Sequence, residues 1–318
     1  LGADVLRLLV AATDYRSEMT ISEEGIKRVG DSYRRIRNTT RYLLGNLEGF
    51  SVDKSLPYKD LISLDQWALR RTASLQTEIK LAYKEYRFHR IYQALHQFCV
   101  VDMGGFYLDV LKDRLYTTPA NSHARLSAQT AMHHILEAMV RWLAPILSFT
   151  AEEIWGHMHG DREDSVFLAE WYESLPEPDA QLGDLNDAAW EEILEVRSEV
   201  GKELERVRVA GEIRGALDAQ VTLYCDDKLH ALLALLGDEL RFVLMTSEAG
   251  IQVLDKARTD ARDTEIAGLK MCVSMSKNEK CERCWHRSDS VSSIEKHPTL
   301  CARCVENIDG QGEDRRYA

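Results

Sequence analysis

Four cysteines near the C-terminus constrain this chain more than any other feature of its sequence. They are Cys281, Cys284, Cys301 and Cys304, in the pattern C-x2-C-x16-C-x2-C. Two residues between paired cysteines let one tight turn aim both sulfurs at a single point, and the longer spacer allows a loop or short hairpin to bring the pairs together. Four thiolates at about 2.3 Å complete a tetrahedron around Zn²⁺ and leave no open position. The spacing therefore predicts one structural zinc ion and no catalytic metal.

Two disulfides, or a chance spacing, are the alternative interpretations of these cysteines. The chain has seven cysteines, an odd number, and its N-terminus shows no charged segment followed by an apolar one. Both observations favour a reducing interior, where paired C-x-x-C units more often bind metal. We therefore expect a cytoplasmic protein in which Cys99, Cys225 and Cys272 are free thiols.

Composition predicts a protein of two or three domains that is richer in helix than in sheet. The chain has 318 residues, of which 45% are hydrophobic, with only six prolines and 18 glycines. A chain of this length can bury a large core. Its longest apolar run is much shorter than a membrane span, so we expect no membrane partner.

Negative charge is concentrated in one segment of the chain. Residues 152–206 carry 17 Asp or Glu against 4 Lys or Arg, so that the rest of the chain is close to neutral despite a total net charge of −12. Such a stretch is most simply a solvated face and linker. Basic residues elsewhere remain able to form local patches, so the overall sign does not exclude tRNA or DNA.

Apolar residues at helical spacing predict a bundle over residues 1–160. Ser22 is the expected N-cap of a helix that ends near Leu47, because two acidic residues follow it. Further amphipathic segments cover 61–88, 88–116 and 121–147. Pro145 should stop the last of them, and Thr150-Ala-Glu-Glu153 fits a capping box that restarts a helix.

A small α/β unit is expected after the bundle. Residues 161–185 look irregular, and 185–209 look helical. Ala219–Cys225 alternates as a strand should, and Arg241–Thr246 is a second candidate strand. A helix over Leu229–Leu236 would connect them. The predicted fold class is therefore mainly α: a helical bundle, a small α/β domain and a C-terminal four-cysteine zinc module.

No catalytic residue is predicted. Ser, His and Asp are scattered without a recognisable nucleophile motif, and no Gly-rich phosphate loop is present.

Two groups of residues are candidates for binding nucleic acid. The first lies on the predicted helix after Ser22 and consists of Lys27, Arg28, Arg34, Arg35, Arg37 and Arg41. Guanidinium groups bind phosphate and stack on nucleobases, although a solvated helix face whose cations pair with nearby acidic residues explains the pattern equally well.

The second candidate group lies in the zinc module. Each C-x-x-C turn, called a knuckle below, has an arginine at its third position, Arg283 in the first and Arg303 in the second, and Trp285 follows the first knuckle. These arginines could neutralise the thiolates, present Trp285 to unpaired bases, or do both.

Several motifs in combination resemble bacterial isoleucine–tRNA synthetase, a class I aminoacyl-tRNA synthetase. The resemblance rests on the segments Leu1-Gly-Ala-Asp-Val-Leu-Arg-Leu8, Asp14-Tyr15, Tyr33-Arg-Arg-Ile-Arg-Asn-Thr39, Pro145–Trp155, Glu170-Trp171, Cys281-Glu-Arg-Cys-Trp-His286 and Cys301-Ala-Arg-Cys304. Pro145–Trp155 alone would also fit valine and leucine relatives, whereas the terminal cysteine quartet favours isoleucine.

The resemblance implies the C-terminal part of such an enzyme. Family members activate isoleucine with ATP in a domain that bears His-Ile-Gly-His-like and Lys-Met-Ser-Lys-Ser-like motifs, and an inserted domain hydrolyses mischarged valine. None of these occurs in this sequence. The chain is therefore expected to be inactive alone, with ATP bound only in the missing catalytic domain. The resemblance implies tRNA(Ile) as the partner and a monomeric full-length protein.

The resemblance also implies a division into functional segments. Residues 1–20 would be the stem-contact end of the catalytic half, 21–160 the anticodon-binding helical bundle, 161–210 an acidic linker and helix, 211–270 a small α/β junction domain and 271–318 the zinc-binding module. The tRNA contacts that it leads us to expect are Arg34, Arg35, Arg37, Arg41, Arg283, Trp285 and Arg303. A zinc-stapled helical scaffold for protein interactions, or the same segment of a valine or leucine relative, remains the alternative.

Overall fold

The computed structural model describes residues 2–16, 18–19, 21–177 and 185–318, which form two compact units. Unit 1 comprises residues 1–109 and 126–181, and unit 2 comprises residues 110–125 and 182–318. The boundary falls inside two helices, α5 (Leu108–Thr117) and α6 (His123–Leu143). Leu1 and Pro178 lie outside the described residues, so the expected segments 1–20 and 161–210 are described only in part.

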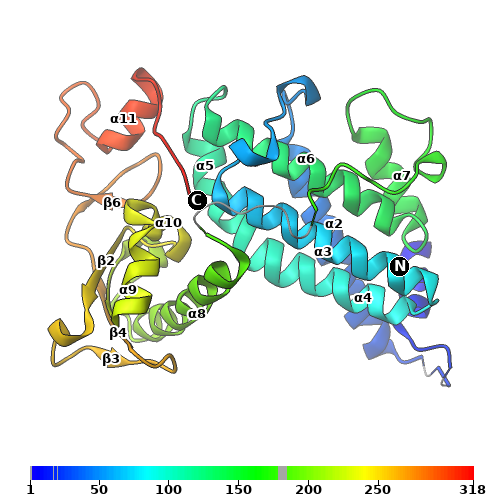
Figure 1. Ribbon diagram of the computed structural model, residues 1–318, viewed down its shortest axis with the longest axis horizontal. Coiled ribbons are helices and arrows are strands. Elements are labelled where there is room, and N and C mark those ends of the chain that lie inside the picture. The colour runs from blue at the N-terminus through cyan, green and yellow to red at the C-terminus, as the bar shows by residue number, and fades with distance from the viewer. Residues whose placement is uncertain (1, 17, 20, 178–184) are drawn as a thin grey trace. The chain divides into compact units, whose positions relative to one another are not determined.

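Unit 1 is helical, as predicted (Figure 1). Besides its parts of α5 and α6, its longer helices are α1 (Ala3–Ala12), α2 (Glu23–Asn46), α3 (Ser63–Lys84), α4 (Phe88–Gln97), a π-helix (Phe98–Tyr107) and α7 (Ser148–His157). Short 3₁₀ turns occupy Val52–Lys54, Tyr58–Asp60 and Val166–Leu168. The expected N-cap of α2 is confirmed, because the Ser22 hydroxyl accepts a hydrogen bond of 3.0 Å from the Gly25 amide.

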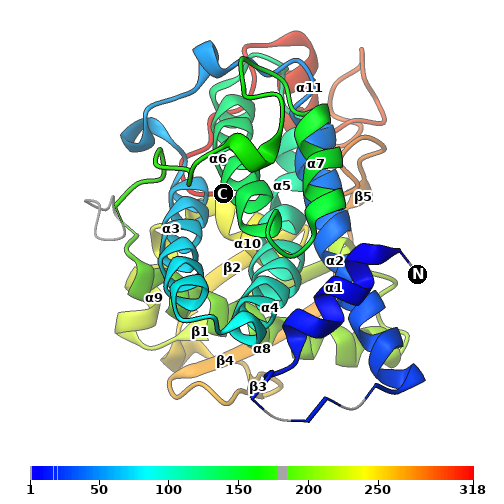
Figure 2. The ribbon, with the colours of Figure 1, turned by 90° about the vertical axis from the view of Figure 1, so that its right-hand side faces the viewer.

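Helix α7 begins differently from the prediction. Its first residue is Ser148, so Thr150 lies inside the helix, and the predicted capping box at Thr150 is wrong. The buried carboxylate of Asp4 in α1 takes the capping role instead. It accepts hydrogen bonds from the Thr150 amide at 2.7 Å, the Thr150 hydroxyl at 2.6 Å and the Phe149 amide at 3.4 Å. Figure 2 shows α1 beside α7, in agreement with their contacts.

The core of unit 1 combines apolar packing with a few satisfied polar groups. Asp65 of α3 is fully buried and accepts hydrogen bonds from Tyr107 at 2.8 Å and from Ser127 of α6 at 2.5 Å. Trp142 is also fully buried, and its indole nitrogen donates to Gln76 at 3.0 Å. Buried polar groups need such partners, so these contacts specify how α3, the π-helix and α6 pack.

Unit 2 contains a four-stranded sheet in the order β2-β1-β4-β3 (Figure 2). The strands are β1 (Ala219–Cys225), β2 (Glu248–Val253), β3 (Arg262–Asp263) and β4 (Leu269–Met275). Strand β1 is parallel to β2 and antiparallel to β4, with Leu223 opposite Ile251 and Met271. Helix α8 (Asp187–Val209) packs against β4, and α9 (Asp227–Ala234) packs against β1 and β2.

The sequence correctly predicted β1, α8 and α9, but the second predicted strand is wrong. Residues Leu240–Leu244 form helix α10, which ends at Met245 in the left-handed conformation. Parallel strands need a crossover connection, and this segment lies on the crossover from β1 to β2. The actual partners of β1 are β2 and β4. Strand β2 is an edge strand and contains Gly250.

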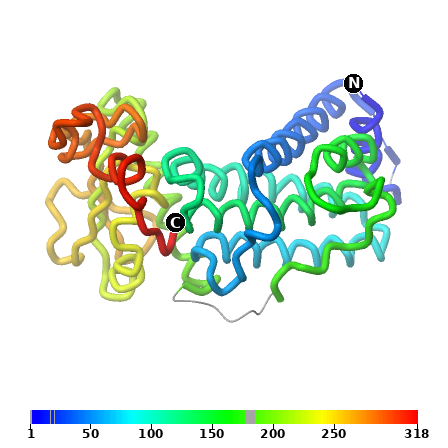
Figure 3. Tube along the Cα trace, turned by 90° about the horizontal axis from the view of Figure 1, so that it is seen from above, coloured from blue at the N-terminus to red at the C-terminus, as the bar shows by residue number. Residues whose placement is uncertain are grey.

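The zinc module follows the sheet in the chain and appears in orange to red in Figure 3. It contains a small ladder of β5 (Glu279–Lys280) and β6 (Arg287–Ser288), and helix α11 (Ala302–Asp309). Arg287 joins it to the sheet, because its Nε donates to Asp218 at 2.8 Å and its backbone amide donates to Ser247 at 2.6 Å. The mainly α fold class with a small sheet is thus confirmed.

Within the described ranges, no helix is both long and apolar enough to cross a membrane.

We predict that Asp4→Ala weakens the N-terminal end of α7. Loss of a capping side chain typically costs about 0.5–2 kcal/mol. Hydrogen exchange of the amides in 148–152 should accelerate by a factor of about 2 to 30. Asp31→Ala, which removes an exposed carboxylate on α2, is the control and should leave this segment unchanged. Unaltered exchange in Asp4→Ala would show that Asp4 does not cap α7.

Unit 1 should lose stability as the pH falls below 6.5. Burial of His134, and then the neighbouring His133, lower the pKa of His134 to about 4, against 6.5 for a free side chain. Between these values the unfolded chain binds the proton and the folded chain does not, so acidification favours unfolding, by about 2 kcal/mol at pH 5. Urea unfolding at pH 7 and pH 5 checks this. A His134→Gln variant should show a smaller difference between the two pH values, and an equal difference would contradict the assignment.

Candidate metal centre and nucleic-acid interface

The four predicted metal ligands lie together in unit 2. Cys281 and Cys284 lie between β5 and β6, Cys301 is the N-cap of α11, and Cys304 lies in its first turn. All four are buried, and their sulfur atoms lie within 4.8 Å of one another. The sulfurs of Cys284 and Cys301 are 3.7 Å apart. A regular tetrahedron with Zn–S bonds of about 2.3 Å has sulfurs about 3.8 Å apart, so the cluster fits zinc.

The backbone of the first knuckle holds its two sulfurs in place. The Trp285 amide donates to the Cys281 carbonyl at 3.0 Å, and the Cys281 amide donates to the His286 carbonyl at 2.9 Å. Trp285 has a positive φ of 66°, which is rare for a bulky residue. The second knuckle is tied to the first, because the Cys301 amide donates to the Cys281 sulfur at 3.4 Å. The chain thus accepts local strain to keep this turn.

Ionisation of the cysteines also favours a bound cation. A hydrogen bond from Cys284 lowers the pKa of Cys301 to about 3, whereas hydrogen bonds with Cys284 and Cys301 raise the pKa of Cys304. Four buried thiolates repel one another, so they cannot all ionise alone. A divalent metal ion would compensate their charge, and metal binding to such a site releases protons.

The two knuckle arginines contact helix α5 within unit 2. The Nη1 of Arg283 donates to the Thr117 carbonyl, at the C-terminal end of α5, at 2.6 Å. Arg303 binds both carboxylate oxygens of Asp113, at 2.7 and 2.8 Å, and also donates to Glu313 at 3.1 Å. Its side chain is only 12% exposed. The expected nucleic-acid contact at Arg303 is therefore corrected: its guanidinium donors are used inside the protein.

Asp113 and Arg315 are important residues that the sequence did not indicate. Arg315 donates to Asp113 at 2.7 Å and stacks 3.5 Å from the centre of the Phe242 ring. Burial raises the pKa of Asp113, but Arg303 and Arg315 outweigh burial and hold it well below its usual range. No local pattern could have shown this group, because Asp113 lies 190 and 202 positions before its two partners.

Trp285 is the most exposed aromatic residue of the zinc module among the described residues. Its side chain is 61% exposed, and the ammonium group of Lys280 lies 5.6 Å from the centre of its ring. Large aromatic side chains are usually at least partly buried, so such an exposed ring beside a cation marks a candidate binding surface.

The basic residues of α2 in unit 1 differ in whether they have partners. Arg34 pairs with Asp31, and Arg37 pairs with Glu153 at 3.1 Å. Arg35 and Arg41 are exposed and have no ion-pair partner in the described part of the chain, and the same is true of Lys27 and Arg28. The helix therefore presents both paired and free cations to solvent.

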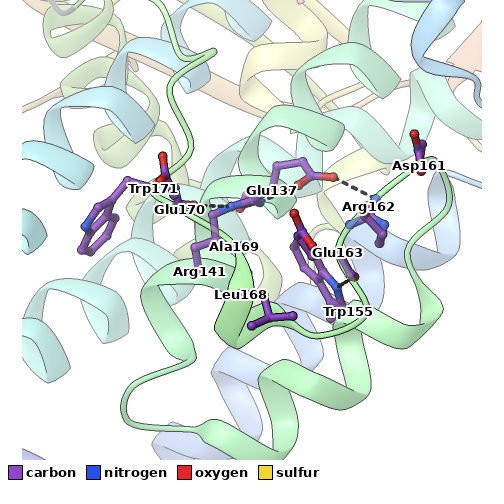
Figure 4. A pocket seen from close by; sticks show the side chains of 10 residues that line it. All are labelled: Glu137, Arg141, Trp155, Asp161, Arg162, Glu163, Leu168, Ala169, Glu170 and Trp171. Carbon is purple, nitrogen blue, oxygen red and sulfur yellow. Dashed lines mark hydrogen bonds and ion pairs between the residues drawn. The ribbon is translucent and has the colours of Figure 1, made fainter.

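One hollow in unit 1 is lined by two arginines that both bind Glu137 (Figure 4). It encloses about 670 Å³. Glu137 accepts hydrogen bonds from Arg141 at 2.6 Å and Arg162 at 3.0 Å, and both guanidinium groups lie within 5 Å of the Trp155 ring centre. The arrangement holds the loop after α7, because Arg162 binds Glu137 and Trp155 donates to the Glu163 carbonyl at 2.8 Å.

Comparisons with known proteins agree with this geometry. A family described as "Anticodon-binding domain of tRNA ligase" matches residues 65–223, and one described as "Zinc finger found in FPG and IleRS" matches residues 278–307. All four cysteines lie inside the second match. The zinc-finger match and the cluster of sulfurs together support one structural zinc ion.

Isoleucine–tRNA ligases are similar to this chain along its whole length. Those of Nitrosococcus oceani and Shewanella amazonensis are 55% and 54% identical to it over 322 and 319 aligned residues. That of Pseudomonas aeruginosa strain UCBPP-PA14 is 54% identical. The alignments cover 100% of this chain, which spans about a third (34%) of the length of these relatives.

The resemblance seen in the sequence is thereby confirmed. The chain belongs to the family of anticodon-binding domains of tRNA ligases, and it matches the C-terminal region of bacterial isoleucine–tRNA ligases.

Proposed function

We propose that this chain is the tRNA(Ile)-binding part of an isoleucine–tRNA ligase, which joins isoleucine to tRNA(Ile) using ATP. In this proposal the whole protein works in the cytoplasm as a monomer, and ATP binds outside the residues of this chain. The segment division described above, from stem-contact end to zinc-binding module, belongs to the same proposal. An anticodon-binding family and isoleucine-specific relatives support it.

The observation that carries the proposal is the exposed Trp285 on a knuckle that four cysteines hold together. Unpaired bases of an RNA loop stack on aromatic side chains, and each stacked base contributes about 1–3 kcal/mol. A ring held on a rigid turn loses little conformational entropy when a base binds. We assign Cys281, Cys284, Cys301 and Cys304 as the zinc ligands that keep this turn fixed.

The cations of α2 provide the second part of the proposed interface. Among the described residues, Arg35 and Arg41 form no ion pair with a carboxylate, so they are the strongest candidates for phosphate contacts. Arg34 and Arg37 would first have to separate from Asp31 and Glu153. Arg283 can contribute positive charge near Trp285 while its Nη1 binds Thr117.

The scaffold hypothesis loses its main support. It relied on the acidic segment 152–206, which would repel phosphate. Three of its carboxylates, those of Glu199, Glu203 and Glu205, are ion-paired along α8, each to the basic residue three positions later. No other observation favours a protein-interaction scaffold over tRNA binding.

We predict about one zinc ion per chain and its loss in Cys281→Ser. Structural zinc in small modules binds with roughly 10–16 kcal/mol, so residues 278–307 should lose protection from hydrogen exchange when it leaves. Elemental analysis and exchange measurements check both effects. Cys272→Ser, which changes a cysteine of β4 outside the cluster, should keep the metal. A native protein without zinc, with its four sulfurs oxidised, would refute the assignment.

We predict that Arg41→Ala and Arg35→Ala weaken binding to tRNA(Ile) in a salt-dependent manner. Each lost phosphate contact should reduce the slope of log affinity against log salt by about 0.7–0.9. Arg34→Ala and Arg37→Ala should have smaller effects, because these side chains are already paired. Titration of labelled tRNA(Ile) at several salt concentrations measures this.

Arg258→Ala is the matched control for the basic helix. Arg258 is an exposed arginine of unit 2 that pairs with Asp260. It should leave both affinity and salt slope unchanged. If Arg41→Ala and Arg35→Ala behave like this control, α2 makes no phosphate contacts. If the native chain fails to bind tRNA even at low salt, the proposed function is wrong.

A further inference from the structure

Tyr116 is a second exposed aromatic residue of unit 2, besides Trp285. It lies near the C-terminal end of α5, and its side chain is 60% exposed, which nearly equals the exposure of Trp285. Tyr116 immediately precedes Thr117, whose carbonyl accepts the hydrogen bond from Arg283 at 2.6 Å. Tyr116 therefore lies next to the point where the first zinc knuckle touches α5.

Helix geometry places Tyr116 at the edge of the contact between α5 and the zinc module. Asp113 and Thr117 both contact the zinc module, through Arg303 and Arg283 respectively. Residues three and four apart lie on the same side of a helix, so Tyr116 is on the side of α5 that carries Asp113. Because it remains exposed, its ring flanks the zinc module and is not covered by it.

Trp285 belongs to the knuckle that makes the same contact. It is two residues after Arg283, and it precedes His286, whose Nδ1 lies 3.8 Å from the Asp113 carboxylate. The His286 ring packs edge-on against Phe242, with ring centres 5.5 Å apart. The residues on either side of Trp285 are thus fixed to α5 or to the core of unit 2, while its own ring faces solvent.

The charges around Tyr116 favour a polyanion. Residues 114–125 contain no Asp or Glu, and the exposed Lys112 precedes Tyr116 by one helical turn. The nearest acid in sequence, Asp113, is neutralised by two arginines. A nucleic-acid backbone can therefore approach this end of α5 without meeting a free carboxylate of that segment.

We propose that Tyr116 and Trp285 together form a stacking surface for two unpaired nucleobases of the bound tRNA. This inference rests on the proposed function and adds to it a binding residue from α5. Arg283 would lie between the two rings, where its remaining guanidinium donors can reach the phosphate that links the bases. The Arg303–Asp113 pair holds the two rings at a constant separation, because it fixes the zinc module on the helix that carries Tyr116.

The experiment compares variants of the full chain in binding an anticodon stem-loop of tRNA(Ile). Tyr116→Ala should weaken binding at least about fivefold, the effect of one lost stacking contact, whereas Tyr116→Phe should bind like the native chain. Phe167→Ala is the control, since Phe167 of the 3₁₀ turn Val166–Leu168 is an exposed aromatic residue (57%) outside the segments expected to contact tRNA. A fully paired duplex of the same length should bind native chain and Tyr116→Ala equally.

Two measurements separate a binding role from a structural one. Zinc content and hydrogen exchange over 278–307 should be unchanged in Tyr116→Ala. Loss of zinc or of protection there, with Tyr116→Phe restoring both, would show a structural role and overturn the proposal.

The outcomes also distinguish this inference from the proposed function. If Trp285→Ala and Arg41→Ala weaken binding but Tyr116→Ala does not, the stacking role of Tyr116 is wrong and tRNA binding stands. If the native chain itself does not bind the stem-loop or the whole tRNA, both are wrong.

Discussion

The carboxylate of Asp113 is the interaction on which the arrangement of unit 2 depends. It accepts two hydrogen bonds from Arg303 in α11 and one from Arg315 in the C-terminal tail, all between 2.7 and 2.8 Å. Buried ion pairs contribute little net stability, because desolvation offsets most of the attraction, but breaking one costs about 3–5 kcal/mol. Such a pair therefore selects one geometry over others. Here it selects the position of the second zinc knuckle on α5.

Zinc and Asp113 constrain the position of different parts of unit 2. Four thiolates around one ion would fix the two knuckles relative to each other, whereas Asp113 fixes the resulting module relative to α5. Phe242 connects the two, because the guanidinium groups of Arg303 and Arg315 lie 5.0 and 3.5 Å from its ring centre. Either constraint alone would leave the exposed Trp285 free to move with its module. Together they give the aromatic surface a defined place in unit 2.

Predictions from the sequence succeeded where the determining contacts are local. The spacing of Cys281 and Cys284 is set by a single turn, and the periodicity of α2 is set by one buried stripe, so both could be read from short segments. The predictions failed where a distant group decides. Thr150 does not cap α7 because Asp4 does, and Arg303 does not face solvent because Asp113 binds it. The partners in these two contacts are 146 and 190 positions apart, and a contact over such a distance produces no recognisable pattern in a single sequence.

Local charge, and not the net charge of −12, would determine how an RNA approaches this chain in the proposed function. At physiological salt an exposed charge is screened beyond about 8 Å. Three carboxylates of α8, those of Glu199, Glu203 and Glu205, are paired within their own helix, so their field falls off faster still. The end of α5 has no acid between residues 114 and 125. An acidic protein can therefore present a surface that accepts phosphate. This requires that its carboxylates lie far from that surface or form ion pairs with neighbouring lysine and arginine side chains.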